Sequence, residues 1–422
     1  MQILLFEDHR IDDLSPLTLM RPPFELICGR ISLRCRIQRW FPGARLLAHI
    51  RPWLRTYYQE QHPGISVNDL VVAQNEATLM INGRWIPEEC PDLSRITFQN
   101  AGFVNDDLAW VLLEPEESRL LCDDEFSSIL IRIAALRRSV SVNGRIARYP
   151  WDLVAGNHRQ LIFDFLSSGA SRPPEAEHVQ VLGDPRDVFV SPEAFIDPYV
   201  VIDASTGPVS VEPEVRIQSF TRIEGPCHIG RGSRIFRALI HGGTTIGEHC
   251  RVGGEIEESI LHAFVNKYHE GFLGHSYVCP WVNLGAMTTT SDLKNDYSSV
   301  RVPVQGEPVD TGLIKVGSFI GDHTKTAIDS MFNTGSLIGV MSMVLPGGRL
   351  LPRNIPSFAN ISFGEIAADW PLNQWLQIAQ ASMKRRDCEL TPAAVEVLRH
   401  LYEVSRKDRD AAVRRLDRHP VV

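Results

Sequence analysis

The chain has 422 residues, of which 44% are hydrophobic and 22% are charged, and its formal net charge is −8. This composition is typical of a globular protein with two or three domains, and it excludes a disordered, collagen-like or membrane-spanning chain. The acidic balance argues against a protein that binds nucleic acid through its overall charge. No apolar run is long enough for a bilayer helix, and acidic residues interrupt the N-terminus where a signal peptide would continue. We therefore expect a cytoplasmic protein with neither membrane nor nucleic-acid partners.

Residues 1–166 have the pattern of a mixed α/β domain. Short apolar runs at 3–6 and 69–73 predict strands, and the helical spacing of apolar residues over 126–140 predicts a helix. Residues 167–187 begin with a stretch rich in Ser, Gly and Pro, which is typical of a linker. The sequence therefore predicts a domain boundary in this segment.

Over residues 188–357 aliphatic side chains recur every six positions, with a few shifts of phase. The positions are Val190, Ile196, Ile202, Val211, Ile217, Ile223, Ile229, Ile235, Ile240, Ile246 and Val252, and then Ile314, Ile320, Thr326, Phe332, Ile338 and Val344. This period fits neither an α-helix nor a single strand. It is the hexapeptide repeat of a parallel β-helix, in which the aliphatic residue points inward. Hexapeptide repeats of this kind resemble the left-handed β-helix, which has three repeats per coil.

Residues 358–422 lose the six-residue period and predict helices. Thr391 followed by Pro392 is typical of a helix N-terminus, and an amphipathic run covers 395–404. We therefore expect a helical C-terminal extension.

A segment dense in polar side chains interrupts the period between Val252 and Ile314. A regular solenoid has no packing need for such an insertion. The chain also has 37 arginines but only six lysines, none of them before Lys267, and four of the six lie within 267–325. A compact ammonium differs from a planar guanidinium at a phosphate or acyl site. The sequence therefore points to residues 267–325 as the first place to look for chemistry.

Eight short motifs occur in order between residues 14 and 325. They are Leu14-Ser15-Pro16-Leu17-Thr18 with Arg21-Pro22, Ile81-Asn82-Gly83-Arg84, Tyr149-Pro150-Trp151-Asp152-Leu153, Gly253-Gly254-Glu255, Asn266-Lys267-Tyr268-His269, Asn283-Leu284-Gly285-Ala286, Ser291-Asp292-Leu293-Lys294-Asn295 and Gly321-Asp322-His323-Thr324-Lys325. Together they resemble the bifunctional N-acetylglucosamine-1-phosphate uridylyltransferase/glucosamine-1-phosphate acetyltransferase family, and more closely a divergent bacterial branch of sugar nucleotidyltransferases. The resemblance implies a nucleotidyltransferase-like α/β domain over 1–166 and an acyltransferase-like left-handed β-helix over 188–357.

The resemblance also implies an acetyltransferase site. In the family a histidine that lies fourteen residues before an Asn-Ile-Gly-Ala segment acts as general base, and here His269 lies fourteen residues before Asn283. An amine that attacks a thioester must lose a proton, and imidazole titrates near the working pH. The implied roles are therefore His269 as the base, Asn283 as an orienting group, and backbone amides near Ala286 as the binders of acetyl-coenzyme A or its oxyanion.

Two departures from the family concern the acceptor. Phe272 stands where the family has a tyrosine, and Glu257 stands where it has a lysine that would attract a sugar phosphate. We expect Lys267, Lys294 and Arg301 to bind the phosphate instead. Further contacts to the acceptor or to acetyl-coenzyme A are expected from Asn295, Tyr297, Asp322 and Lys325.

The N-terminal domain departs further from its relatives. Sugar-phosphate nucleotidyltransferases usually have a glycine-rich phosphate loop and a lysine after the first strand, and this chain has neither. Any cation at the nucleotide phosphates must be an arginine, and we expect Arg21, with Arg30 and Arg34 behind it. The alternative for Arg21 is a structural role in a proline turn.

The metal ligands of this domain are also altered. Asn82 and Gly83 lie where related enzymes have an Asn-Gly-Asp metal segment, but Arg84 replaces the aspartate. We expect Asn82 and Gly83 to contact the nucleotide or sugar phosphate. We expect Asp8 and Asp152 to hold Mg²⁺, unless Asp152 only caps a helix.

The function that follows from the resemblance is a transferase of activated amino-sugar synthesis. It would acetylate a sugar 1-phosphate with acetyl-coenzyme A on the β-helix, and would carry out UTP-dependent nucleotidyl transfer on the N-terminal domain. By the same resemblance we expect a homotrimer with active sites between neighbouring β-helices. The first alternative is a non-catalytic scaffold that binds a sugar nucleotide. The second is a zinc hydratase that would use His262, His269, His275 and His323.

Overall fold

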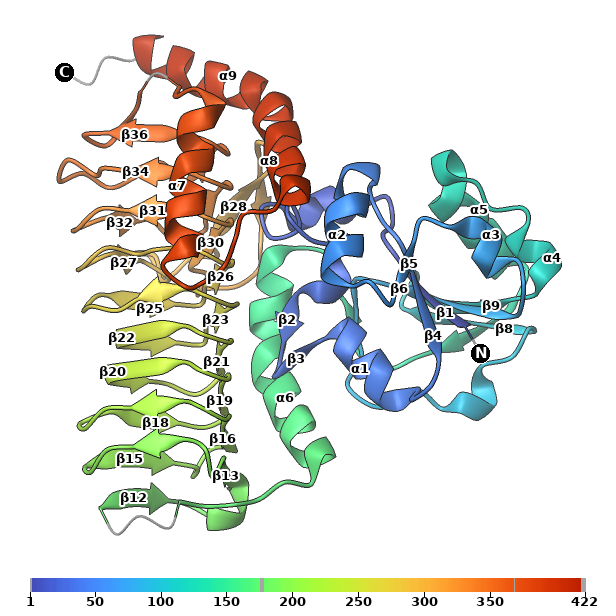
Figure 1. Cartoon of the computed structure of the whole chain (residues 1–422), viewed down its shortest axis with the longest axis horizontal. Helices are drawn as coiled ribbons and strands as arrows, with labels where there is room; N and C mark the ends of the chain where they lie inside the picture. The colour runs from blue at the N-terminus through green and yellow to red at the C-terminus, as the bar shows by residue number, and fades with distance from the viewer. Residues whose placement is uncertain (1, 175–177, 368, 419–422) are drawn as a thin grey trace.

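The computed structural model describes residues 2–174, 178–367 and 369–418. An α/β domain, a left-handed parallel β-helix and a helical extension follow one another along the chain, so the predicted fold class is confirmed (Figure 1). Among the described residues, no helix is both long and apolar enough to cross a membrane.

A twisted seven-stranded sheet forms the centre of the N-terminal domain, in the order β10-β8-β9-β6-β1-β4-β5. Its strands are β1 (Gln2–Phe6), β4 (Arg45–His49), β5 (Ser66–Val67), β6 (Thr78–Asn82), β8 (Asn100–Val104), β9 (Asp107–Leu113) and β10 (Arg138–Ser141). Four helices lie beside it, α1 (Leu33–Trp40), α2 (Arg55–Gln61), α3 (Leu70–Ala73) and α5 (Phe126–Ala135), with the short α4 (Pro115–Ser118). Strand β1 is the strand predicted at 3–6. It is buried and lies between β4 and β6.

Two elements of this domain differ from their predictions. Residues 69–73 form the short helix α3 and not a strand, because the Asp69 carboxylate accepts a hydrogen bond from the Val72 amide and caps a helical turn. The helix predicted over 126–140 ends at Ala135. The chain then enters β10, which pairs with β8 and forms one edge of the sheet.

The long helix α6 (Pro150–Ser168) lies between the N-terminal domain and the β-helix (Figure 1). Its buried Asn157 accepts a hydrogen bond from the Gly29 amide at 2.7 Å and donates one to the Gly243 carbonyl at 2.8 Å. One amide therefore fastens the two domains together. Gly169 ends the helix in a left-handed conformation, and the first coil already begins at Val179, so the connection is shorter than the linker predicted over 167–187.

Each coil of the β-helix contributes strands to three faces. Face A contains β13 (Val188–Val190), β16 (Val209–Val211), β19 (Cys227–Ile229), β21 (Thr244–Ile246), β23 (Ile260–Leu261), β26 (Tyr277–Val278), β30 (Ser318–Ile320), β33 (Ser336–Ile338) and β35 (Asn354–Ile355). Face B contains β14 (Phe195–Ile196), β17 (Arg216–Ile217), the first halves of β20 (Arg234–Ile240) and β22 (Arg251–Glu257), β24 (Asn266–Lys267), Asn283, β31 (Lys325–Thr326), β34 (Met343–Val344) and β36 (Asn360–Ser362). Face C contains β12 (Val179–Leu182), β15 (Val200–Asp203), β18 (Arg222–Glu224), the second halves of β20 and β22, β25 (Phe272–Gly274), β27 (Thr289–Thr290) and β32 (Met331–Phe332).

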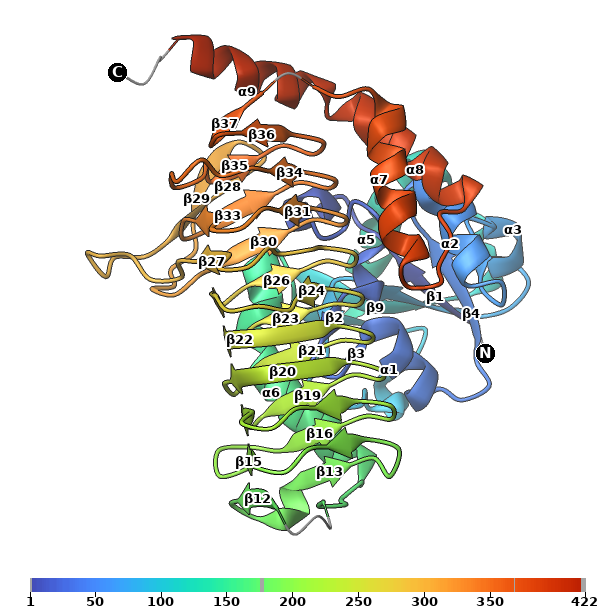
Figure 2. The same ribbon diagram turned by 60° about the vertical axis from the view of Figure 1, so that its left-hand side comes forward.

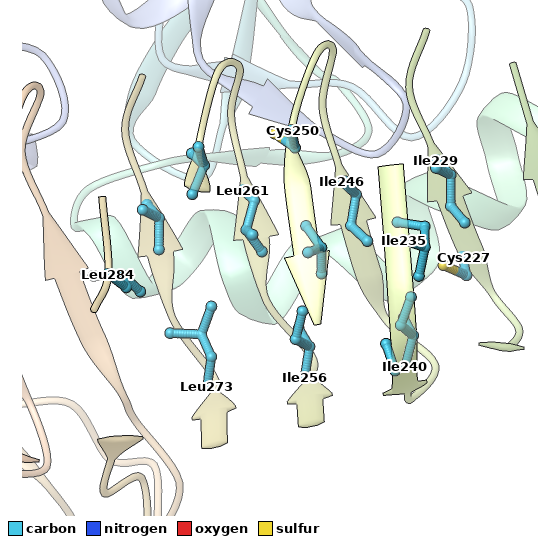
Figure 3. Close-up of a cluster of buried hydrophobic side chains, with 14 of the residues drawn as sticks. Cys227, Ile229, Ile235, Ile240, Ile246, Cys250, Ile256, Leu261, Leu273 and Leu284 are labelled. Atoms are coloured by element: carbon cyan, nitrogen blue, oxygen red, sulfur yellow. The ribbon is translucent and has the colours of Figure 1, made fainter. Parts of the chain in front are cut away.

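The aliphatic side chains of the repeat stack in columns inside the β-helix (Figure 3). The coils also continue beyond Val252, where the six-residue period of the sequence is interrupted. Ile256, Leu261, Leu273 and Leu284 fill interior positions there. Two of these steps span five residues rather than six, which hid them from a strict count. Ile314 is the opposite case, since its side chain is 58% exposed and is not part of the interior.

The true insertion covers residues 291–317, between face C and face A. It carries the hairpin of β28 (Arg301–Val304) and β29 (Glu307–Asp310). Two small two-stranded sheets are formed by β2 (Ile27–Cys28) with β3 (Ile31–Ser32) and by β7 (Trp85–Ile86) with β11 (Arg145–Ile146). On face B, β37 (Glu365–Ile366) pairs antiparallel with β36.

The helical extension was predicted to begin at residue 358, but β36 adds one more strand to face B first. The extension then consists of α7 (Leu372–Lys384), α8 (Pro392–Val404) and α9 (Arg406–Arg418). The predicted cap is confirmed, because the Thr391 hydroxyl accepts a hydrogen bond from the Ala394 amide at the start of α8. Helix α7 runs beside the upper coils, and α8 reaches across to α2 of the N-terminal domain (Figure 2). Trp375 and Leu398 share one buried cluster with Met341 of the β-helix and Tyr58 of the N-terminal domain, so the extension is packed onto both other parts.

Candidate functional site

His269 lies in the turn between β24 and β25, at the corner between faces B and C, and its side chain is exposed. Lys267 supports this turn from inside the coil. Its side chain is almost fully buried at an interior position, and its Nζ donates hydrogen bonds to the His269 and Gly253 carbonyls, both at 2.8 Å. Burial lowers the pKa of Lys267 to about 8. The sequence predicted that Lys267 binds a ligand phosphate, but Lys267 instead positions the turn from within the coil.

The next coil places the second motif beside His269. The Leu284 amide donates to the Asn266 carbonyl at 2.8 Å, and the Met287 amide donates to the Glu270 carbonyl at 2.9 Å. The turn that contains Ala286 therefore stacks on the turn that contains His269. Asn266 Nδ2 donates to Asn283 Oδ1 at 2.6 Å, which holds both asparagines in one column of face B.

The Ala286 amide has no hydrogen-bond acceptor within the described parts of the chain, although its neighbours Gly285 and Met287 both have one. An exposed imidazole and a free backbone N–H thus lie on stacked turns. Acyl transfer requires groups of these two kinds, a proton acceptor and a hydrogen-bond donor.

Lys325 lies one coil further along the same column. Its Nζ donates to the Trp281 carbonyl at 2.6 Å and to the His323 carbonyl at 3.0 Å, and burial lowers its pKa to about 7. The side-chain nitrogen of Lys325 is thus bonded to backbone carbonyls of the fold. The predicted ligand contact of Lys325 is therefore replaced by a role in holding the adjacent coils.

The other predicted contacts to the acceptor lie in the insertion, at the corner between faces C and A. Lys294 hydrogen bonds to Ser298 and, at 3.3 Å, to the Ser299 carbonyl, and Arg301 lies 4.0 Å from the carboxylate of Asp310. Two further predicted residues of this segment, Asn295 and Tyr297, are exposed. Within one chain the structure does not bring these residues to the corner that carries His269.

The sequence missed a cluster of charged side chains around His275. Its Nδ1 lies 2.7 Å from Asp292 and its Nε2 lies 3.4 Å from Glu258, while Lys315 pairs with Glu257 at 2.7 Å. Of these residues, Glu258, His275 and Lys315 line a pocket of about 270 Å³ beside Trp151 of α6. The signal was present in the sequence as two adjacent glutamates followed by a histidine seventeen residues later, which is one coil.

This cluster bears on the zinc alternative. Glu257, Glu258 and His275 are close enough to share a cation. Burial would lower the pKa of His275, but Asp292 and Glu258 raise it to about 9, so a metal ion would have to displace a proton that both carboxylates stabilise. His262 instead faces the Glu25 carbonyl at 3.2 Å, and His269 is exposed. The predicted set of four histidines does not converge.

The raised pKa of His275 predicts a stability effect of pH. The pKa of this histidine is about 9 in the folded protein and 6.5 in the unfolded chain. Its contribution to the free energy of unfolding is therefore complete below pH 6.5 and is lost as the pH rises to about 9. We expect this loss to be on the order of 3 kcal/mol. Lys267 and Lys325 act in the opposite direction, because burial lowers their pKa values.

The quantity to measure is therefore the difference between the parent and His275→Gln in urea unfolding from pH 6 to pH 10. We expect the parent to lose its advantage over this range. The exposed His178 serves as the control, and a constant difference across the range would contradict the role given to His275.

The N-terminal domain does not present the predicted magnesium ligands. The Asp8 carboxylate is paired with the buried guanidinium of Arg84 and accepts a hydrogen bond from Asn82 Nδ2 at 2.9 Å. Burial would raise the pKa of Asp8, but the bonds from Arg84 and Asn82 hold it below its usual value. Arg84, which replaces the family's aspartate, thus neutralises the carboxylate that a cation would need. Gly83 is packed against Phe24, so it is closed to a nucleotide as well.

Asp152 behaves as the helix cap that competed with metal binding. Its carboxylate accepts hydrogen bonds from the Arg148 and Tyr149 amides at 2.7 and 2.9 Å, at the start of α6. Burial raises the pKa of Asp152, and these amides offset the rise only in part. Since Asp8 and Asp152 are each satisfied by different protein groups, the residues present do not fit a Mg²⁺ site.

Arg21 does not face a phosphate site either. Its guanidinium forms a two-pronged ion pair with Asp322 of the β-helix, across 301 residues of sequence. Burial would lower the pKa of Arg21, but Asp322 keeps it above its ordinary value. Both predicted ligand residues, Arg21 and Asp322, are therefore joined to each other, and the pair ties the N-terminal domain to the β-helix.

Comparison with known proteins supports the two-part character of the chain. Residues 3–172 match the profile of a family described as sugar nucleotidyl transferase. A stretch of 153 residues is 34% identical to a bifunctional sugar-1-phosphate nucleotidylyltransferase/acetyltransferase of Sulfurisphaera tokodaii and covers 33% of this chain and 38% of that protein. A stretch of 109 residues is 34% identical to the bifunctional protein GlmU of Methanococcus maripaludis and covers 25% of this chain and 26% of that protein.

A third relative matches over more of its own length. The uncharacterized acetyltransferase YaiX of Escherichia coli is 29% identical over 161 residues, which are 37% of this chain and 70% of that protein. The chain spans well under half the length of the first two relatives. These two are archaeal, so the resemblance is not confined to a bacterial branch.

Proposed function

We propose that the protein is a transferase of activated amino-sugar synthesis, which acetylates an amino-sugar 1-phosphate with acetyl-coenzyme A at the corner that carries His269. The observation that supports this most is the stacking of the Ala286 turn, with its free N–H, on the turn of the exposed His269. The relatives whose names include an acetyltransferase agree with it. The cytoplasm, where acetyl-coenzyme A and sugar phosphates are found, is the proposed location.

The chemistry of each group follows from its position. Acetyl-coenzyme A supplies the thioester. His269 takes the proton that the attacking amine must lose and returns it to the departing thiolate, so the protons balance. The Ala286 N–H donates to the oxygen on which negative charge develops. Lys267 holds the His269 carbonyl, and Asn266 holds Asn283, so both stacked turns are fixed before the substrate arrives.

The assembly that this site requires is a homotrimer. The insertion carries Lys294 and Arg301 at a different corner from His269, so only a neighbouring chain could bring them to the same site. We expect light scattering to give three times 47.4 kDa at working concentration. A mass near that of one chain would contradict the trimer.

Nucleotidyl transfer on the N-terminal domain is the second candidate function, and the match over residues 3–172 favours it. The Asp8–Arg84 pair opposes a metal-dependent reaction there. We therefore expect slow or no pyrophosphate release from UTP and N-acetylglucosamine 1-phosphate with Mg²⁺. Rapid release that Asp8→Asn abolishes would show that Asp8 is free to act.

A further inference from the structure

Three arginines follow one another on adjacent coils of face B. The register pairs Arg216 with Arg234, and Arg234 with Arg251. Neighbouring strands lie about 4.8 Å apart, so these side chains leave the same face of the sheet at that spacing. The guanidinium of Arg216 is occupied, since it lies 5.0 Å from the ring centre of Phe195.

The C-terminal extension brings two more arginines close to this column. Arg385 and Arg386 follow directly after α7, which runs beside the coils (Figure 2). Burial, together with Arg234 and Arg385, lowers the pKa of Arg251, and burial, together with Arg251 and Arg234, lowers the pKa of Arg386. The four guanidinium groups are therefore within electrostatic range of one another.

No carboxylate balances this cluster in the portion of the chain that the structure describes. None of Arg234, Arg251, Arg385 and Arg386 forms an ion pair there, although the chain has 51 acidic residues. The Nε of Arg251 is buried and has no hydrogen-bond acceptor. Arginine stays protonated at any physiological pH, and like charges at this range repel. The fold thus keeps four cations together with one buried donor open, an arrangement that an external anion would satisfy.

We propose that Arg234, Arg251, Arg385 and Arg386 form a binding site for a phosphate ester that carries at least two negative charges. Planar guanidinium groups match phosphate oxygens through paired hydrogen bonds. The rings of Phe236 and Tyr268 lie beside the cluster, with their centres 4.0 Å apart. Phe236 shares β20 with Arg234, and Tyr268 interacts electrostatically with Arg251. The helical extension then has a definite role, because it supplies half of the site.

The position of the cluster also fits the proposed acetyltransferase corner. Arg251 pairs with Asn266 on the next coil, and the ring centre of Tyr268 lies 4.7 Å from that of His269. A phosphate held by the arginines would leave the rest of its ligand beside the His269 turn. The proposal concerns phosphate binding alone, so its test does not depend on whether the protein transfers an acyl group. Two sources carry this chemistry, the phosphates of coenzyme A and a sugar 1-phosphate.

Titration calorimetry on the full chain at low salt separates these sources. The probes are coenzyme A, dephospho-coenzyme A, glucosamine 1-phosphate and glucosamine. We expect Arg251→Gln to lower the affinity for the phosphate ester about 10- to 100-fold. We expect the same loss from the double variant with Arg385→Gln and Arg386→Gln. Arg216→Gln is the matched control in the same column and should bind as the parent does. Preference for coenzyme A over dephospho-coenzyme A identifies the 3′-phosphate, whereas binding of glucosamine 1-phosphate but not glucosamine identifies the sugar ester.

Three results would overturn the proposal. The first is equal affinity of the parent and both variants for every phosphate ester. The second is binding that inorganic sulfate at the same concentration removes completely, which indicates an adventitious ion only. The third is a change in oligomer mass without a change in affinity, because the arginines would then pair with carboxylates of a neighbouring copy. If Arg251→Gln fails to fold, the double variant with Arg385→Gln and Arg386→Gln still decides the test.

Discussion

His269→Ala should lower acetyl transfer by roughly two to four orders of magnitude while leaving the affinity for acetyl-coenzyme A nearly unchanged. The exposed imidazole is the proton acceptor of the proposed reaction, and thioester binding does not need it. The measurement is the release of free thiol with an amino-sugar 1-phosphate as acceptor, with calorimetric titration of the coenzyme alongside.

The control for this variant is His249→Ala, another histidine at a corner of the β-helix, whose ring stacks on Phe264 at 5.1 Å. Its activity should remain close to that of the parent. If His269→Ala retained full transfer, the proposed role of this corner would be wrong, and the scaffold alternative would gain support.

Asp322→Ala should destabilise the protein by about 3–5 kcal/mol, because it leaves the Arg21 guanidinium buried without its partner. Both side chains are largely inaccessible, at 12% for Arg21 and 3% for Asp322, so water cannot replace the lost carboxylate. Urea unfolding monitored by tryptophan fluorescence measures the effect. Replacing both residues with leucine should recover part of the loss, since no uncompensated charge then remains.

The exposed pair of Arg349 and Glu365 provides the comparison for this change. Glu365→Ala should cost at most about 1 kcal/mol, because solvent screens such pairs. A stability of Asp322→Ala equal to that of Glu365→Ala would show that the pair between the domains has no structural role.

Periodicity made the β-helix predictable, since every interior residue must recur at the length of one strand and turn. The same count failed where the spacing fell to five residues, at Leu261, and where Lys267 took an interior position. It also included Ile314, which has the right spacing but lies in the insertion. The short helix at 70–73 was missed because one carboxylate, that of Asp69, decides between helix and strand.

The site was predictable where one coil separates its parts. The motifs around His269 and Asn283 lie about one coil apart in sequence, so the structure stacks them. Pairs that depend on tertiary packing were not predictable. Arg21 meets Asp322 across 301 residues, and Asp8 meets Arg84 through the pairing of β1 with β6. Arg21, Asp322 and Asp8, which the sequence predicted to bind a ligand or a metal ion, are engaged in these pairs.

The arginine cluster shows the same limit. Arg234 and Arg251 are seventeen residues apart, and Arg216 and Arg234 are eighteen apart, so coil length must be known before the column can be seen. Arg385 and Arg386 join it only through the course of α7. Charge pattern along the sequence gives no such alignment.

The structure of the protein bound to acetyl-coenzyme A tests the central claim most directly. We predict that the thioester lies at the corner between faces B and C, with its oxygen within hydrogen-bond distance of the Ala286 N–H and its carbonyl carbon facing the His269 ring. A coenzyme bound at another corner, or an Ala286 N–H that contacts no part of it, would contradict the proposal that this corner is the site of acyl transfer.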